Sequence, residues 1–391
     1  KRKDDFTLQM GFVPTMQVFR GRYFNLNRQL LSVIGQWPFR SKTWNKITTM
    51  VIICLGGSQF VAKVCGLISV LDDVNLILES LGPMIIDIGA GVKLFNKTLL
   101  NIKENYSTII QQHEVDDLRR YSEVGRKITV LYSGFLFFGT VCFILLPIVP
   151  QLLDRELNET ERQFIHNVKY FVDEQKYYYP IMLHSYVMVV ICITIVTALD
   201  SLFVVMVQHA CCLFCILGKR IENISAEFDL NIELYPSTSE DISFKRSKDC
   251  IILHNRAIDF ANLIEATFST SYFFQSGLNM FVVSVTAVQA AMNLNNSHEF
   301  IRQVSFQACV LLHLYFECSQ GQQLMNHKTF RIHLKWYQTS MRTRKLVSVM
   351  IMRVKNLSVL TAGKVFNISM ETFSMIVRTS VSYFTVLQSM Q

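Results

Sequence analysis

The last stretch of the sequence carries hydroxyl groups at a spacing that suits contact with water or ions. The stretch from Ser369 to Met390 is apolar enough to enter a membrane, and a helix of that length would rise about 33 Å, enough to cross a hydrocarbon core of about 30 Å. Ser369 is placed to cap this helix, and Gly363 and Asn367 interrupt the chain just before it. One face is small and polar, because its residues recur at alternating steps of three and four: Thr372, Met375, Thr379, Ser382, Val386 and Ser389. A spanning helix turns such a face toward protein or water, so the face is either a seam between helices or the wall of a pore.

No residue pattern points to catalysis. The nine histidines show no metal-ligand spacing of the His-Glu-x-x-His kind, and neither a glycine-rich phosphate loop nor a Gly-x-Ser-x-Gly motif occurs. Cys211, Cys212 and Cys215 invite a metal interpretation, but no second pair of ligands accompanies them, so small apolar packing is the better interpretation. We therefore expect no enzyme activity, no cofactor and no bound metal.

Composition assigns the chain to the polytopic membrane proteins. Half of the 391 residues are hydrophobic, only 17% are charged, and the mean hydropathy is +0.28. The 29 Phe and 16 Met also exceed what an ordinary soluble domain contains. The net charge of +8 is spread between hydrophobic runs, which indicates a topology signal rather than a nucleic-acid partner. The sequence therefore predicts an all-α membrane protein.

Seven stretches are long and apolar enough to be membrane spans. Lys63 interrupts the first near its far end, and its long side chain is expected to reach the membrane interface. The second carries Glu79, Asp87 and Lys93, so it should face the bundle interior or a wet cavity rather than lipid all round. The fourth and fifth are longer than a bilayer is thick, so part of each should lie outside it. The predicted spans are about 47–71, 74–100, 128–149, 181–217, 250–292, 302–325 and 369–390.

The distribution of Lys and Arg predicts the orientation. These residues gather before the first span and between spans two and three, four and five, and six and seven, and are scarce in the alternate segments. By the positive-inside rule the amino terminus is cytosolic and the carboxyl terminus extracellular. The surplus of the long helices then lies in the cytosol as a helical anchor. The resulting division is a cytosolic segment 1–46, spans one to six within 47–320, anchor segments 218–249 and 321–362, and the seventh helix within 363–391.

The outer halves of spans three to six are rich in aromatic and sulfur-containing side chains. They form either ordinary bundle core or an apolar cavity with a few hydroxyls, suited to a small hydrophobic ligand. The candidate ligand-binding residues, chosen by shared helical face and matching depth, are Phe135, Phe138, Cys142, Tyr179, Met182, Tyr186, Met280, Val283 and Phe306.

Two Asn-x-Ser/Thr sequons, at Asn158 and Asn295, fall in predicted outer loops and are candidate N-glycosylation sites. None of the ten cysteines falls in such a loop, so no disulfide framework is expected.

The end of the chain resembles the carboxyl-terminal signature of the insect odorant receptors. The resemblance is carried by Thr361–Phe373 and Ser380–Leu387, and by the pattern of His254, Phe260 and Glu265 in the fifth span. Length, seven spans and an inside amino terminus agree with that family over essentially the whole chain.

This resemblance implies a ligand-gated, poorly selective cation channel in the plasma membrane of olfactory sensory neurons. Four subunits would surround one pore, and a small volatile hydrophobic ligand would bind in the outer half of each odorant-specific, or tuning, subunit. Tuning subunits assemble with a shared co-receptor. Because the co-receptor carries a much longer segment between spans four and five, this chain resembles a tuning subunit. The resemblance places a hydrophobic gate at Val386 and Met390, with Thr379 and Ser382 on the pore wall.

A gustatory-type receptor of the same superfamily, which would assemble without the co-receptor, is the closest alternative. A G-protein-coupled receptor also has seven spans, but its orientation is opposite, and its Asp-Arg-Tyr and Asn-Pro-x-x-Tyr motifs do not occur at the expected places. A transporter should show an internal repeat, and the sequence shows none.

Overall fold

A computed structural model shows how the chain folds. It describes residues 22–37, 40–70, 77, 80, 81, 84, 87–90, 114–145, 164, 168–170, 172–173, 176–225, 242–292, 294, 297–328, 341–355 and 359–389. Both predicted glycosylation sites, Asn158 and Asn295, lie outside the described residues, as do Met390 and most of the predicted second span.

Nearly all of the described structure is helical, which confirms the predicted all-α class. Two short 3-10 helices, η1 (Arg22–Phe24) and η3 (Asn223–Ser225), accompany the longer ones. The α-helices are α2 (Asn25–Val33), α3 (Lys42–Ile68), α6 (Val115–Leu145), α8 (Tyr178–Glu222), α10 (Ile242–Met292), α11 (Ser297–Lys328), α12 (Met341–Lys355) and α13 (Met370–Ser389).

Among the described residues, α3, α6 and α8 are long and apolar enough to cross a membrane by length and composition. The orientation of the chain across that membrane stays a prediction.

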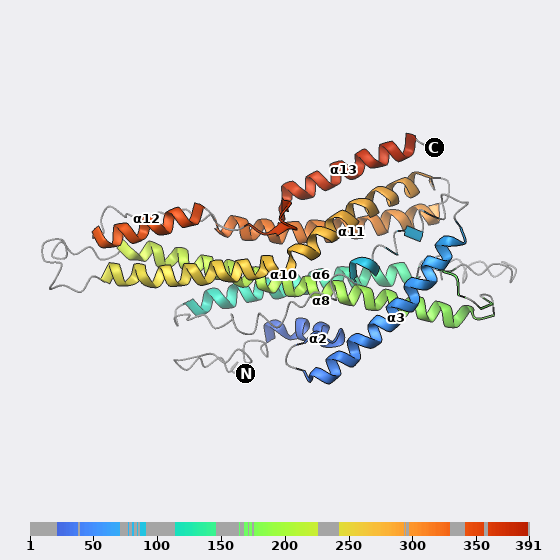
Figure 1. Cartoon of the computed structure of the whole chain (residues 1–391), viewed down its shortest axis with the longest axis horizontal. Coiled ribbons are helices and arrows are strands. Elements are labelled where there is room, and N and C mark those ends of the chain that lie inside the picture. The colour runs from blue at the N-terminus through green and yellow to red at the C-terminus, as the bar shows by residue number, and fades with distance from the viewer. Residues whose placement is uncertain are drawn as a thin grey trace.

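Helix α8 is the centre of the bundle. Every residue from 197 to 214 is buried, so this part of the helix is packed on all sides, as expected for a helix with apolar residues on every face. It lies along α6, α10, α11 and α2, and it extends along the long axis of the molecule in Figure 1. The largest hydrophobic core follows it and includes Phe203, Phe214 and Ile264.

The overlong helices exist as the sequence predicts. Helix α8 has 45 residues and α10 has 51, which correspond to about 68 and 77 Å of helix. Helix α6, by contrast, begins well before the predicted span. The prediction missed its first turns because they are charged. Glu114 and Asp117 at this end pair with Arg220 and Lys219 of α8, at 2.6 and 2.7 Å. Hydropathy identifies the part of a helix that can meet lipid and misses such polar extensions.

A short hairpin connects the bundle to the last helix. Strands β1 (Thr361–Ala362) and β2 (Phe366–Asn367) pair antiparallel around a turn in which Gly363 and Lys364 have φ values of 60° and 61°. The Gly363 amide donates to the Ser269 carbonyl oxygen at 3.0 Å, which fixes the turn to α10. The sequence predicted only an interruption here, so the hairpin is an addition to the predicted fold.

Helix α13 starts where the sequence predicted. The Ser369 hydroxyl accepts a hydrogen bond from the Thr372 amide at 3.3 Å, so Ser369 is the N-cap. One face of α13 packs on α10 and α11, with Ile376 and Ser380 4% and 1% exposed. In Figure 1, α13 (red) leaves the bundle at the hairpin, and α12 lies toward the opposite end of the molecule.

The contact between the hairpin and α11 gives a first testable prediction. A Cβ added at Gly321 of α11 would overlap the carbonyl oxygen and side chain of Ile368. Because a backbone oxygen cannot move aside easily, Gly321→Ala is expected to lower the free energy of unfolding by about 2–4 kcal/mol. The unfolding temperature of the purified protein in detergent measures this change. Gly277→Ala on α10, where nothing lies within 4 Å, is the matched control and should not lower that temperature. Equal behaviour of the two variants would show that the hairpin is not seated on α11 as described.

Candidate ligand pocket and pore helix

Two of the predicted ligand-binding residues meet in one aromatic cluster. Met182 and Tyr186 of α8 pack with Tyr178, with Phe143 of α6 and with Phe164. The Tyr186 hydroxyl oxygen is buried and makes no hydrogen bond with the described residues. A buried hydroxyl without a partner costs about 1–3 kcal/mol, so the cluster holds a polar group that a ligand can satisfy.

Two further candidates lie in an adjoining cluster. Val283 of α10 packs with Val282 and Val310, and Phe306 of α11 lies against them. The rings of Phe306 and Phe143 have centroids 6.3 Å apart and join this cluster to the first. Side chains of α6, α8, α10 and α11 therefore border one apolar region, which matches the kind of site that the sequence predicts for a hydrophobic ligand.

Four candidates point largely away from this region, although the Tyr179 ring meets the Tyr178 ring edge-on, with centroids 5.5 Å apart. Phe138 and Tyr179 are 69% and 71% exposed, and Phe135 and Cys142 are also exposed on the outer surface of the chain. Helical spacing identifies residues that share a face of α6, but it does not say which neighbour that face meets. These four side chains would contact lipid or another subunit.

The charge in the first span is buried, so the expectation that Lys63 reaches the interface was wrong. Its ammonium group lies 2.7 Å from Asp87 Oδ2, and the two side chains are only 5% and 15% exposed. The Cys192 thiol of α8 donates to the other oxygen of Asp87 at 3.3 Å. Through Lys63 and Cys192, Asp87 connects its own helical segment to α3 and α8, as expected for a carboxylate that faces the bundle interior.

A second polar group connects the segment before α8 to the bundle. The Tyr170 hydroxyl donates to Gln59 Oε1 at 2.7 Å and lies 2.6 Å from His184 Nδ1. Burial raises the pKa of Tyr170, so its hydroxyl stays protonated and available as a donor. This network borders the apolar region on the side of α3.

A cavity of about 10 Å³, room for one water molecule, lies elsewhere, between η1, α6 and α8. It is lined by residues that include Tyr23, Tyr121, Gln208 and His209, and none of the predicted ligand-binding residues borders it.

The remaining candidate, Met280, lies between the apolar region and the last helix. Its side chain packs against the buried cluster of Leu314, Cys318 and Ile376, the last of which belongs to α13. The Ser380 hydroxyl donates a bifurcated hydrogen bond, to the Met280 carbonyl oxygen at 3.2 Å and to the Ile376 carbonyl oxygen at 2.9 Å. Val283, one turn further along α10, belongs to the ligand-side cluster. This turn of α10 therefore contacts both the candidate pocket and the helix predicted to line the pore.

The predicted pore face of α13 is open in the single chain. Met375 and Val386 are 48% and 54% exposed, Ser382 is exposed and Thr379 is partly exposed. Thr372, in the first turn of α13, is buried at the hairpin junction, so the open face begins one turn later than predicted.

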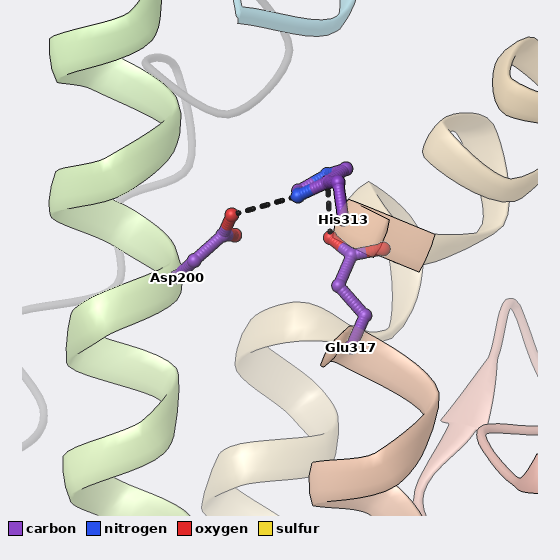
Figure 2. A group of neighbouring side chains, drawn as sticks. All are labelled: Asp200, His313 and Glu317. Atoms are coloured by element: carbon purple, nitrogen blue, oxygen red, sulfur yellow. Dashed lines mark ion pairs between the residues drawn. The ribbon is translucent and has the colours of Figure 1, made fainter. Parts of the chain in front are cut away.

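Sequence reasoning missed one buried polar cluster. Asp200 of α8 and His313 and Glu317 of α11 converge in the bundle, as Figure 2 shows. A four-residue spacing on α11 was the available signal for the last two, but Asp200 comes from a distant part of the chain and had no local signal.

Comparison with known proteins shows to which family this architecture belongs. The chain matches the family model described as 7tm Odorant receptor over residues 89–381. It is 21% identical to Odorant receptor 13a of Drosophila melanogaster over 397 residues, covering 92% of this chain and 93% of that protein. It is 25% identical to Odorant receptor 63a of the same species over 205 residues, covering 51% and 47%.

The fold is also that of solved olfactory receptors. The insect olfactory receptor OR5 from Machilis hrabei superimposes with a TM-score of 0.78 in complex with eugenol and 0.75 in the structure described without it. Identities are 14% and 15%, and both alignments cover 97% of this chain and 100% of the receptor chain. Because the family model spans most of the sequence, the chain belongs to the 7tm odorant receptor family, a family of multi-pass membrane receptors.

Proposed function

We propose that this chain is an odorant-specific subunit of a ligand-gated, non-selective cation channel. It binds a small volatile hydrophobic molecule in the region bordered by Met182, Tyr186, Val283 and Phe306, and it contributes α13 to the pore of a heterotetramer with a co-receptor. The proposed location is the plasma membrane of an olfactory sensory neuron, at its dendrite. Family membership and the similarity to a receptor solved in complex with eugenol support this assignment.

The observation that carries the proposal is the double contact of one turn of α10. Val283 packs with the ligand-side cluster, while Met280 packs with Ile376 and accepts the Ser380 hydrogen bond of α13. A ligand that fills the apolar region stabilises one arrangement of α8, α10 and α11, and this arrangement shifts the position of α13. Movement of Val386 away from the pore axis then wets a dry constriction and admits cations.

Whole-cell recording tests the proposal directly. Cells expressing this chain, an insect co-receptor, or both are exposed to a panel of volatile molecules that includes eugenol. Fast cation current only in cells with both chains is the expected result. Current from this chain alone would argue against an obligatory co-receptor. Absence of current in every case, with the protein present at the cell surface, would argue against the channel.

The buried Tyr186 hydroxyl predicts how the pocket discriminates ligands. Tyr186→Phe removes the only polar atom of this side chain and leaves its ring packing with Met182 unchanged. We expect a 5–10-fold higher half-maximal concentration, that is about 1 kcal/mol, for agonists with a hydroxyl or carbonyl group, and no change for hydrocarbon agonists. Dose–response curves for matched pairs of such agonists measure the effect.

Tyr179→Phe is the control, because Tyr179 lies on the same helix but is 71% exposed. A uniform loss of sensitivity to all agonists in Tyr186→Phe, or an equal effect of Tyr179→Phe, would remove Tyr186 from the proposed pocket.

A further inference from the structure

Three ionisable side chains meet in the interior of the bundle, away from the candidate pocket. Asp200 of α8 is 1% exposed, and His313 and Glu317 of α11 are 7% and 2% exposed. The imidazole lies between the two carboxylates, with Nδ1 3.3 Å from Asp200 Oδ2 and Nε2 3.3 Å from Glu317 Oε1, as drawn in Figure 2. Burial of two carboxylates is costly unless positive charge compensates them.

The neighbouring Tyr132 of α6 decides which nitrogen of His313 carries the proton. The Tyr132 hydroxyl donates to Asp200 Oδ2 at 2.7 Å, and the Tyr132 hydroxyl oxygen lies 2.6 Å from His313 Nδ1. Since a hydroxyl has a single proton, its oxygen must accept from Nδ1–H. The ring of Phe316 stacks on Tyr132 at 3.7 Å and holds this arrangement. In the neutral ring, Nε2 therefore carries a lone pair.

That lone pair faces Glu317. His313 Nε2 is buried and has no hydrogen-bond partner among the described residues, although the carboxylate oxygen is only 3.3 Å away. A lone pair and a carboxylate oxygen at this distance repel each other unless a positive charge lies between them. An ion about 2.1 Å from both atoms would subtend an angle of about 104° at the metal, close to the value in a tetrahedral site.

We propose that Asp200, His313 and Glu317 form a binding site for a divalent transition-metal cation such as Zn²⁺. One donor atom from each residue can be chosen so that all three lie within 4.8 Å of one another, and Asp200, which now faces Nδ1, must turn toward the Nε2 side to complete the coordination shell. One imidazole with two carboxylates suits Zn²⁺ and related first-row ions better than Ca²⁺ or Mg²⁺, which prefer oxygen ligands alone. Tyr132 acts as the outer partner that orients the imidazole.

The consequence of binding is a link between two helices. Asp200 comes from α8, whereas His313 and Glu317 come from α11, so a bound ion would hold these helices together at a point further along α8 than Met182 and Tyr186. The inference does not depend on the channel function, because metal binding by the isolated chain can be measured without any current.

The test uses the full-length chain purified in detergent without a histidine tag, with Co²⁺ as a spectroscopic probe and Zn²⁺ as competitor. The expected result is a visible Co²⁺ absorption that develops at one equivalent and disappears on addition of Zn²⁺. His313→Gln and Glu317→Gln should each weaken Co²⁺ binding by at least about tenfold, and Tyr132→Phe by about 10–100-fold, the range found when outer partners of metal ligands are removed.

Glu265→Gln provides the matched control, since it removes a carboxylate from α10 but keeps an acceptor for the Thr361 hydroxyl, 2.7 Å away. This variant should bind Co²⁺ as the unmodified chain does. The unfolding temperature of every variant without metal shows whether it is folded, and Tyr132→Phe, which leaves all three ligands in place, serves if a ligand variant does not fold. Absence of a saturable Co²⁺ signal, or equal signals in the three site variants and the control, would overturn the metal site and leave a proton shared by His313 and Glu317.

Discussion

Replacing Lys63 by methionine is expected to destabilise the receptor by about 3–5 kcal/mol, the largest loss of stability that we predict for any single substitution. The change leaves Asp87 as a buried carboxylate without the ammonium group that now lies 2.7 Å away. Removal of one member of a buried ion pair costs more than the pair itself contributes, because the remaining charge keeps its desolvation penalty. The fall in unfolding temperature of the purified protein, together with the amount at the cell surface, measures the effect.

Two further variants identify the cause. Lys127→Met removes an exposed lysine from α6 and should leave the unfolding temperature within a few degrees of the unmodified value. The double variant Lys63→Met with Asp87→Leu replaces the whole pair by apolar groups, and we expect it to recover most of the stability. If the double variant were no more stable than Lys63→Met alone, loss of packing and not an unpaired charge would explain the result.

The parts of the fold that the sequence predicted correctly rest on local signals. The Ser369 cap, the length of α8 and the start of α13 depend on residues that lie next to one another in the chain. The hairpin at Gly363 depends instead on Ser269 of α10, and the partner of Lys63 lies on another helical segment. A contact between distant segments leaves no periodic pattern in the sequence, so these features could not be predicted from it.

The same distinction applies to the candidate site. Helical spacing placed Phe135, Phe138 and Cys142 on one face of α6, and the structure turns that face outward. Met182 and Phe306 were chosen by the same reasoning, and they lie in clusters joined through Phe143, which was not chosen. Helical periodicity therefore identifies residues that share one face of a helix, whereas the packing of the whole bundle decides which face meets the ligand region.

The open face of α13 gives the prediction with the largest effect on current. Val386→Cys places a thiol at the proposed constriction with little change in side-chain volume, and a positively charged methanethiosulfonate applied from outside should attach to it. A fixed unit charge about 4 Å from a passing cation costs about 4 kcal/mol at an effective dielectric constant of 20. We therefore expect odorant-evoked current through receptors with the co-receptor to fall by at least about tenfold, and to return when a reducing agent removes the adduct.

The contrast with Val381→Cys makes this a test of which face lines the pore. Val381 is 56% exposed, as open as Val386 in the single chain, but it lies about 140° around the helix. If exposure alone governed the effect, both variants would lose current. If the polar face lines the pore, only Val386→Cys should do so, because a charge at position 381 is separated from the permeating ion by the helix itself. The unmodified receptor is treated in parallel, which measures any effect of the reagent on its own exposed cysteines, Cys54 and Cys142. Block at Val381→Cys without block at Val386→Cys would place the pore on the other side of α13 and make the seam between helices the better interpretation of its hydroxyl face.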